Sequence, residues 1–245
     1  GIQMQTCESP EFVFTSESVS EGHPDKVCDL IADSILDAHI AADRNARVAC
    51  EVLCKGGHVI LAGEITSRAT VDVAPIVREV IRRIGYSDSG EPFNADGVSI
   101  QELITLQAAE IHDVVGAGQG QGAGDQGLMF GYATDETPER MPLAILLAHR
   151  LAALLARDRH DRRVDWLRPD AKTQVSVRYR DGRPVQVETI LVSTQHSRAV
   201  GQPEVEAYVR EELLERALGE WYRKGIQVIA NPSGSFLQGG PSADA

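Results

Sequence analysis

A histidine, an aspartate and a lysine lie close together near the start of the chain. His23, Asp25 and Lys26 flank Pro24, which is a favourable first residue for a helix. A helix N-terminus attracts anions, and an aspartate beside it can hold a hard cation that bridges phosphate oxygens. The spacing therefore indicates either a site for phosphate and metal or a well-capped helix with a solvated first turn.

Glu51 and Glu64 form a second candidate pair. Alternating apolar residues on both sides of a Lys-Gly-Gly-His turn predict a β-hairpin. With the turn centred on its two glycines, residue 51 lies opposite 62 and residue 49 lies opposite 64. Both glutamates then share the face opposite the apolar rows, because side chains alternate along a strand. This face is either simply solvated or a polar wall able to bind a cation or an ammonium group.

Residues 116–131 contain seven glycines, and residues 122–127 match the pattern G-x-G-x-x-G. The match fails as a dinucleotide fingerprint, since no clear strand leads into it and no helix follows directly. What remains is a flexible backbone that carries Asp125, which is either functional or part of a linker. Further on, Lys172 enters a predicted strand. It could place an ammonium group beside a phosphate at a sheet edge, or be an ordinary surface lysine.

Hydrophobic periodicity predicts the elements that must position these residues. Helices are expected to begin at Pro24, about residue 72, residue 143 and Pro203, with Gly85 ending the second. Strands are expected at 12–15, 48–54, 59–65, 173–179, 184–193 and 227–230, the fourth and fifth joined by an Asp-Gly type I′ turn. Each half reads helix, hairpin, helix. We therefore expect an α+β fold in which a sheet covered by helices occurs twice.

Composition narrows the class of protein. The 245 residues are 42% hydrophobic and 24% charged, as in a soluble globular protein. The net charge of −12 argues against nucleic acid as a partner, because binding to phosphate backbones needs a basic face. No apolar run approaches the ~20 residues that cross a bilayer, and no secretory segment opens the chain, so we expect no membrane partner and a cytoplasmic location. The four cysteines are predicted to be small core residues rather than zinc ligands.

Several longer strings resemble the S-adenosylmethionine synthetase family. They are residues 14–26, 122–133, 166–172, 193–197 and 231–234, and the resemblance runs from about Phe12 to Ala245. It implies repeated α+β domains of that family, two of the usual three being present. The expected boundaries are 11–113 for the N-terminal domain, 114–127 for a connecting loop, 128–238 for the central domain and 239–245 for the start of a truncated C-terminal domain. The implied reaction is attack of the methionine sulfur on C5′ of ATP, with release of triphosphate that is hydrolysed to pyrophosphate and phosphate.

The resemblance also implies a role for each residue that matches a family motif. His23 and Lys172 would be catalytic, Asp25 would ligate Mg²⁺, and Glu51 would help to hold K⁺. ATP would contact His23, Asp170, Ala171, Lys172, Ser235, Phe236 and Asp244. Methionine would contact Glu64, Gln107, Asp125 and Asp244. Residues 108–118 resemble the family's mobile gate over the site.

Family members form their active sites between two subunits, so the resemblance implies a homodimer through the sheets and a dimer of dimers. Three features depart from the family pattern. The family usually continues past residue 241 into a domain with further basic residues. It often has Arg where this chain has Ser235, and it usually has an apolar pair where this chain has Leu237 and Gln238. We therefore expect the 245-residue portion alone to be inactive. The alternative to a synthetase is a catalytically inactive fragment or a regulatory subunit of the same fold. Retention of His23, Asp25, Glu64 and Lys172 argues against a pure scaffold.

Overall fold

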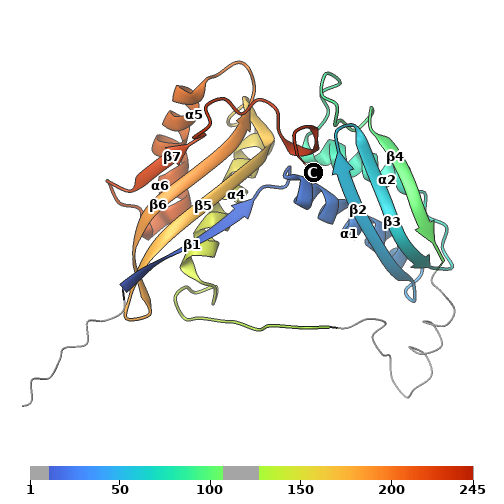
Figure 1. Ribbon diagram of the computed structural model, residues 1–245, viewed down its shortest axis with the longest axis horizontal. Coiled ribbons are helices and arrows are strands. Elements are labelled where there is room, and N and C mark those ends of the chain that lie inside the picture. The colour runs from blue at the N-terminus through green and yellow to red at the C-terminus, as the bar shows by residue number, and fades with distance from the viewer. Residues whose placement is uncertain (1–10, 107–126, 245) are drawn as a thin grey trace, which may run out of the picture. The chain divides into compact units, whose positions relative to one another are not determined.

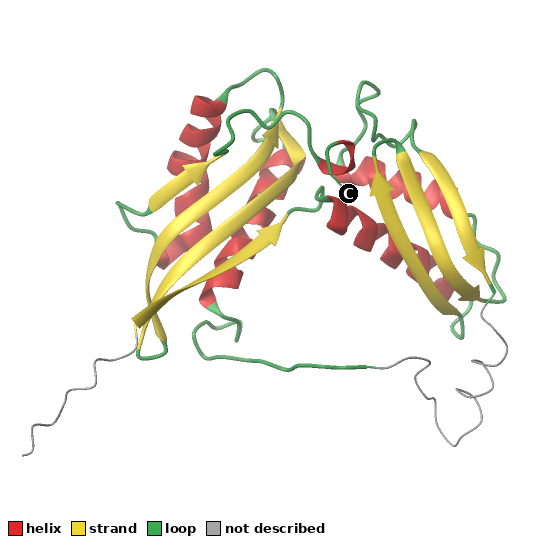
Figure 2. Ribbon diagram, viewed as in Figure 1, coloured by secondary structure: helices red, strands yellow, loops and turns green. Residues whose placement is uncertain are grey.

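The computed structural model describes residues 11–106 and 127–244, and they form two compact units (Figure 1). Among the described residues, the unit that contains helix α1 comprises residues 24–106, 127–132 and 240–244 and is called the α1 unit. The unit that contains helix α4 comprises residues 11–23 and 133–239 and is called the α4 unit. Each unit has a sheet with helices on one of its faces (Figure 2). The α+β class expected from the sequence is confirmed.

The α1 unit contains a three-stranded sheet of order β2-β3-β4. Strands β2 (Arg47–Lys55) and β3 (His58–Thr66) form the expected antiparallel hairpin, and β4 (Ser99–Thr105) adds in parallel to β3. Strand β4 was not expected from the sequence. Helices α1 (Pro24–Ala42) and α2 (Val73–Ile84) bury their apolar stripes under the sheet.

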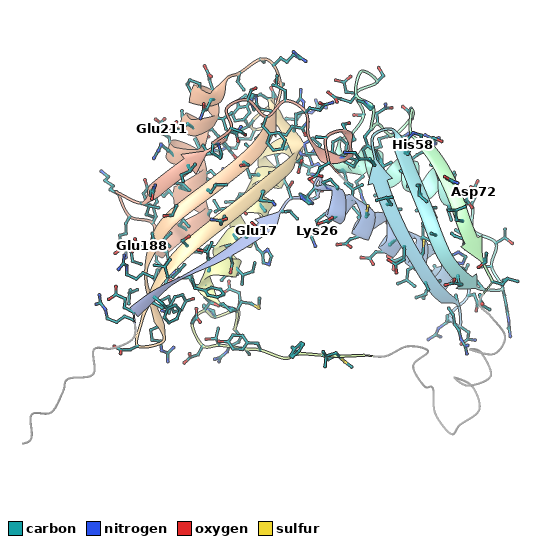
Figure 3. The ribbon with its side chains drawn as sticks, viewed as in Figure 1. Glu17, Lys26, His58, Asp72, Glu188 and Glu211 are labelled. Carbon is teal, nitrogen blue, oxygen red and sulfur yellow. The ribbon has the colours of Figure 1, made fainter. Side chains whose placement is uncertain are left out.

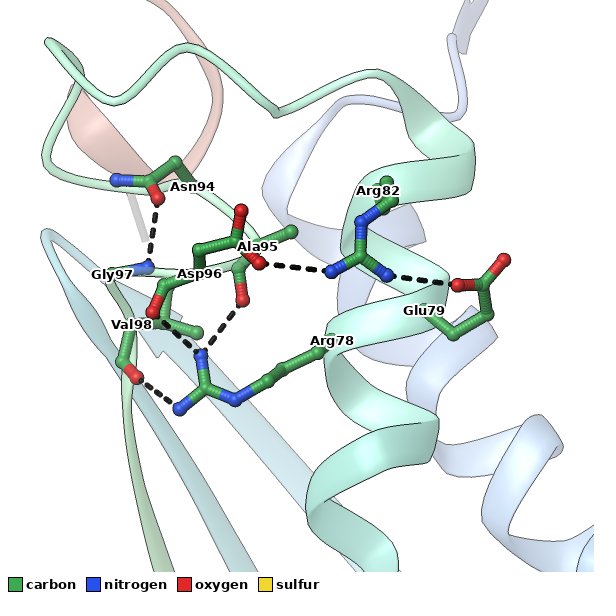
Figure 4. Close-up of polar contacts among 8 residues, drawn as sticks. All are labelled: Arg78, Glu79, Arg82, Asn94, Ala95, Asp96, Gly97 and Val98. Atoms are coloured by element: carbon green, nitrogen blue, oxygen red, sulfur yellow. Dashed lines mark hydrogen bonds and ion pairs between the residues drawn. The ribbon is translucent and has the colours of Figure 1, made fainter.

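Local sequence accounts for the bounds of helix α2. The Asp72 side chain accepts a hydrogen bond from the backbone N–H of Ala74, and Gly85 ends the helix in the left-handed conformation with φ 111°. Both devices pair backbone groups that helix ends leave unsatisfied. Arg78, on the same helix, fixes the loop that leads into β4. Its guanidinium donates to the carbonyl oxygens of Ala95 (2.7 Å) and Val98 (3.1 Å), as Figure 4 shows.

The α4 unit contains a four-stranded sheet of order β1-β5-β6-β7. Strands β1 (Glu11–Val19), β5 (Leu167–Arg180) and β6 (Arg183–His196) pair antiparallel, and β7 (Gln227–Ala230) pairs in parallel with β6. The turn between β5 and β6 has positive φ at both Asp181 (53°) and Gly182 (71°), as the expected type I′ turn requires.

Helices on one face bury the core of the α4 unit. They are α4 (Leu143–His160), α5 (Gln202–Tyr208), a π-helical turn (Val209–Leu213) and α6 (Leu214–Leu218). A short 3-10 turn, Gly219–Trp221, follows. In both units the order helix, two antiparallel strands, helix, parallel strand recurs, so the repeated architecture is confirmed. In the α4 unit the edge of β5 additionally pairs with β1.

The last residues of the chain return to the α1 unit. A 3-10 turn, Gly240–Ser242, lies beside the β2–β3 turn, where the Gly56 N–H donates to the Pro241 carbonyl (2.7 Å). The Lys55 ammonium donates to the Ala243 carbonyl (3.0 Å), which brings Asp244 to the same end of the hairpin. Across residues 11–106 and 127–244, no helix combines the length and the apolar character needed to span a bilayer.

Candidate functional site

The hairpin of the α1 unit carries the predicted acidic wall. Glu51 pairs with Ala62, and Ala49 pairs with Glu64, as the turn position predicted. Both glutamates are exposed, while the alternate positions Cys54, Val59 and Leu61 are fully buried against the helices. The shared face of Glu51 and Glu64 is therefore confirmed.

The acidic wall continues across the sheet onto β4. Glu64 pairs with Thr105, and Leu103 lies beside Ala62 on the same face. Leu53 and Leu103 are about half exposed there, at 50% and 54%. The wall thus combines two carboxylates, which could attract a cation or an ammonium group, with apolar side chains. Gln107 lies two residues beyond Thr105, outside the described residues.

Asp25 lies in the first turn of helix α1 and is exposed, so its carboxylate is accessible at the positive end of the helix dipole. Lys26 follows it and forms an exposed ion pair with Asp29 (3.4 Å). Within the described residues no group of three or more His, Cys, Asp and Glu side chains could together hold a metal ion. A single carboxylate still fits Mg²⁺, which is usually bound by one or two carboxylates together with phosphate oxygens and water.

In the α4 unit, the turn formed by residues 20–23 carries His23 and is packed against the start of β5. The Ser20 N–H donates to the Ala171 carbonyl (2.9 Å), and the Ser20 hydroxyl donates to the Pro169 carbonyl (2.6 Å). Gly22 lies so close to Pro169 that an added Cβ would be 2.4 Å from its carbonyl carbon. These contacts connect the His23 turn directly to the residues expected to bind ATP.

Three of those residues, Asp170, Ala171 and Lys172, lie on β5 at or next to a shift in its register with β6. The shift falls between Leu167 and Ala171, and such irregularities re-aim side chains next to functional sites. Asp170 is buried (7% exposed), whereas the Lys172 side chain is 45% exposed. Lys172 forms an ion pair of 3.7 Å with Glu17, which lies on β1 (Figure 3). This pair is weak because it is exposed.

The segment that follows β7 completes this side of the α4 unit. Phe236 and His196 are joined twice: the Phe236 N–H donates to the His196 Nε2 (3.0 Å), and the His196 N–H donates to the Phe236 carbonyl (2.9 Å). The Gln195 side-chain amide donates to the Leu237 carbonyl (3.1 Å), while its oxygen accepts from the Asp170 N–H (3.4 Å). The α4 unit thus brings Asp170 together with the backbone next to Phe236.

Three residues in this arrangement were not expected to take part: Gln195, His196 and Asn231. The buried Asn231 side chain accepts from the Thr194 N–H (2.8 Å) and donates to the Thr194 carbonyl (3.0 Å), which fixes the end of β6. Their signal in the sequence was their presence in two of the family-like strings. Spacing alone could not find them, because their partners lie about 25 to 40 residues away.

The other predicted site residues take different places. Ser235 is exposed next to Phe236 in the α4 unit, and Asp244 is exposed beside the hairpin of the α1 unit. Asp125 and the predicted gate at residues 108–118 lie outside the described residues. Of the cysteines, Cys54 is fully buried, whereas Cys28 and Cys50 are partly buried against the same core, and all three are free thiols. Cys7 lies outside the described residues.

Comparison with known proteins identifies the class to which this fold and these residues belong. The family model described as S-adenosylmethionine synthetase, N-terminal domain, matches residues 11–109, and the model for the central domain matches residues 120–236. The chain therefore belongs to the S-adenosylmethionine synthetase family.

Two curated relatives are named S-adenosylmethionine synthase. The one from Brachyspira hyodysenteriae is 44% identical over 249 residues, covering 97% of this chain and 63% of the relative. The one from Sorangium cellulosum is 48% identical over 239 residues, covering 96% of this chain and 57% of the relative. The chain thus spans about three fifths of the length of these relatives.

Proposed function

We propose that the protein containing this chain is a methionine adenosyltransferase, which makes S-adenosylmethionine from ATP and L-methionine. The observation that supports this most directly is the match of both family domains in order, with the relatives' name S-adenosylmethionine synthase. The proposal concerns the whole protein, in the cytoplasm. Residues 1–245 alone are expected to turn over little or no substrate.

The α4 unit is proposed to bind ATP. Asp170, Ala171 and Lys172 would contact the nucleotide together with Ser235 and Phe236, and the Lys172 ammonium would face the phosphates. Asp244 would serve either the nucleotide or methionine. His23 would contact the junction of ribose and triphosphate and assist departure of the leaving group. These roles fit the turn at residues 20–23, which is packed on the backbone of Pro169 and Ala171.

The α1 unit is proposed to bind methionine. Glu64 would hold the ammonium group, with Gln107, Asp125 and Asp244 completing the polar contacts. The apolar part of the acidic wall would then contact the side chain. A neutral thioether needs no general base, so the protein's contribution would be alignment of the sulfur with C5′ and stabilisation of charge that develops on the triphosphate.

Two cations are proposed as cofactors. Asp25 would bind Mg²⁺ together with phosphate oxygens, and Glu51 would help to hold K⁺ on the acidic wall. When bound, these cations would neutralise phosphate charge that this acidic chain offsets poorly by itself. Asp25→Asn should raise the Mg²⁺ concentration needed for half-maximal activity about tenfold or more, whereas Asp29→Asn, on the same helix, should leave it unchanged.

A homodimer is proposed as the working assembly, with dimers pairing into tetramers. Leu53 and Leu103 are half-exposed on the same face of this sheet, so pairing of the sheets would bury both side chains. Leu53→Glu should shift the sedimentation coefficient toward that of a monomer. A full-sized assembly in this variant would contradict pairing through this face.

The function itself is tested with the protein at its full natural length. Incubation with ATP, L-methionine, Mg²⁺ and K⁺ should yield S-adenosylmethionine, pyrophosphate and phosphate in equal amounts, measured by chromatography. Omission of methionine should abolish the sulfonium product. ATP consumption without S-adenosylmethionine would refute the proposed activity.

A further inference from the structure

A compact ionic cluster in the α4 unit lies on the turn that carries His23, and nothing in the proposed reaction assigns it a role. It consists of Glu21 in the turn and of Arg159 and His160 at the end of helix α4. The Arg159 guanidinium donates to the Glu21 Oε1, and the His160 Nε2 lies 2.6 Å from the same oxygen. Arg159 and His160 also contact each other, at 3.0 Å. We refer to these three side chains as the Glu21 clamp.

Glu21 and Arg159 are more protected from solvent than an ordinary surface ion pair, whereas the His160 side chain is 45% exposed. The Arg159 side chain is 12% exposed and that of Glu21 is 31% exposed, whereas the Arg163–Glu212 pair just beyond the helix is 50% and 47% exposed. Exposed pairs contribute little, because water and salt screen them and ordering two long side chains is costly. The partly buried Glu21 clamp should therefore hold its turn far more firmly than its neighbour holds its loop.

The end of helix α4, which carries Arg159 and His160, is itself held in place by other helices. Asp158, the residue before Arg159, is 1% exposed and accepts two hydrogen bonds from Arg216 of α6, at 2.7 and 2.8 Å. It also accepts one from the Tyr208 hydroxyl, at 2.7 Å. The end of α4 is therefore anchored to α5 and α6, so Arg159 acts from a rigid base.

The turn that receives this contact has little freedom left. Ser20, the first residue of the turn, is hydrogen-bonded to β5, and a side chain added at Gly22 would clash with Pro169. The His23 N–H donates back to the Ser20 carbonyl (3.1 Å). Glu21 is the remaining residue, and the clamp ties its side chain to α4. Two separate elements, β5 and α4, thus determine where the backbone of His23 lies.

We infer that Glu21 and Arg159 are positioning residues, which hold the His23 turn against β5 so that His23 is aligned with the nucleotide bound by Asp170 and Lys172. The inference rests on the proposed function for its catalytic consequence. A displacement of about 1 Å in a reacting group can cost about a hundredfold in rate. Loss of the clamp should therefore lower kcat strongly, while the free energy of unfolding changes little.

The test compares Glu21→Gln, Arg159→Gln and Arg159→Lys in the protein at its natural length. We expect the two Gln variants to reduce kcat by about ten- to a hundredfold, with the KM for methionine within about twofold of the wild type. Arg159→Lys, which keeps the charge, should recover most of this loss. Arg163→Gln breaks the exposed neighbouring pair and is the matched control, expected to keep the wild-type kcat.

Amide hydrogen exchange supplies a readout that does not depend on turnover. In the Gln variants the amides of Ser20 and His23 should exchange at least about tenfold faster, while the amides of β6 keep their protection. If Glu21→Gln and Arg159→Gln left exchange in the turn unchanged, or if Arg163→Gln lost as much activity as they do, the inference would be overturned. If the wild-type protein made no S-adenosylmethionine, the proposed function would fail, and exchange alone would decide whether the clamp holds the turn.

Discussion

The two units have the same order of secondary-structure elements, but their interiors are stabilised by different kinds of contact. In the α1 unit, the buried polar residues among the described positions are His39 and Asn94, and the core is otherwise apolar. The α4 unit buries the carboxylates of Asp158 and Asp170. A buried carboxylate is stable only when it is paired, so the α4 unit adds ionic contacts to its apolar core, whereas the α1 unit relies on apolar packing.

The same contrast extends to the proposed substrates. The α1 unit is proposed to bind the amino acid through acids and apolar surface, whereas the α4 unit is proposed to bind the nucleotide through Lys172 and His23. Substitutions matched between the units should therefore affect different kinetic parameters.

Lys172→Ala should lower kcat by about a hundredfold or more, because it removes the cation proposed to face the leaving triphosphate. Its melting temperature should stay near that of the wild type, since the ion pair with Glu17 is exposed. Steady-state kinetics and calorimetry measure the two effects. Lys224→Ala, in an exposed position of the same unit, is the control. Equal activity of the two variants would show that Lys172 takes no part in catalysis.

Asp158 should make the α4 unit the acid-sensitive one. Burial favours the neutral carboxyl, but the hydrogen bonds from Arg216 and Tyr208 outweigh it, so the pKa of Asp158 is lowered from 3.8. A lowered pKa in the folded state contributes stability that is present above pH ~4 and is lost as the pH falls further. Asp158→Asn should cost about 1–3 kcal/mol at pH 7 and flatten this dependence, as measured by urea unfolding.

The control for Asp158 is Glu212→Gln, which removes an exposed partner of Arg163. It should change the free energy of unfolding by less than about 1 kcal/mol. If Asp158→Asn unfolded with the same pH dependence as the wild type, the acid sensitivity would have to come from other carboxylates. The contrast between the two units would then lose its ionic basis.

Glu64→Gln should raise the KM for methionine by about ten- to a hundredfold while the KM for ATP changes little. The expected size follows from loss of one hydrogen bond to a charged group, about 1.5–3 kcal/mol. Glu102→Gln is the matched control, since Glu102 is exposed one position along from Leu103 on β4, where side chains point to the opposite face. An equal effect of both variants on KM would argue against a specific role for the acidic wall.

Asp72→Ala should have the smallest effect, a loss of about 1 kcal/mol in the free energy of unfolding, because it removes the N-cap of α2. Turnover should remain that of the wild type, since the cap lies in no proposed contact with substrate. Asp88→Ala, in the loop after α2, offers a comparison for a carboxylate that caps a turn rather than a helix. Activity lost in Asp72→Ala at full stability would reveal a role that capping does not explain.

Features that depend on residues close together in the chain could be predicted from the sequence alone. The type I′ turn at residues 181–182 and the bounds of α2 follow from residues a few positions apart. The register of Glu51 and Glu64 follows from a turn position and a side-chain period of two, so one face of the site could be predicted. The roles of individual residues were implied by the resemblance to the family, since the position of a carboxylate on a strand does not show which ligand it binds.

Tertiary structure decided what depends on distant residues. The strand at residues 11–19 precedes α1 in the chain, yet it pairs with β5 some 160 residues later. Nothing in its sequence indicates which strand it pairs with. The parallel position of β4, the contacts of Gln195 and His196 with the 236–237 backbone, and the Glu21 clamp are of the same kind. Each joins groups whose separation along the chain leaves no periodic signal, and only burial and hydrogen bonding in the folded unit select them.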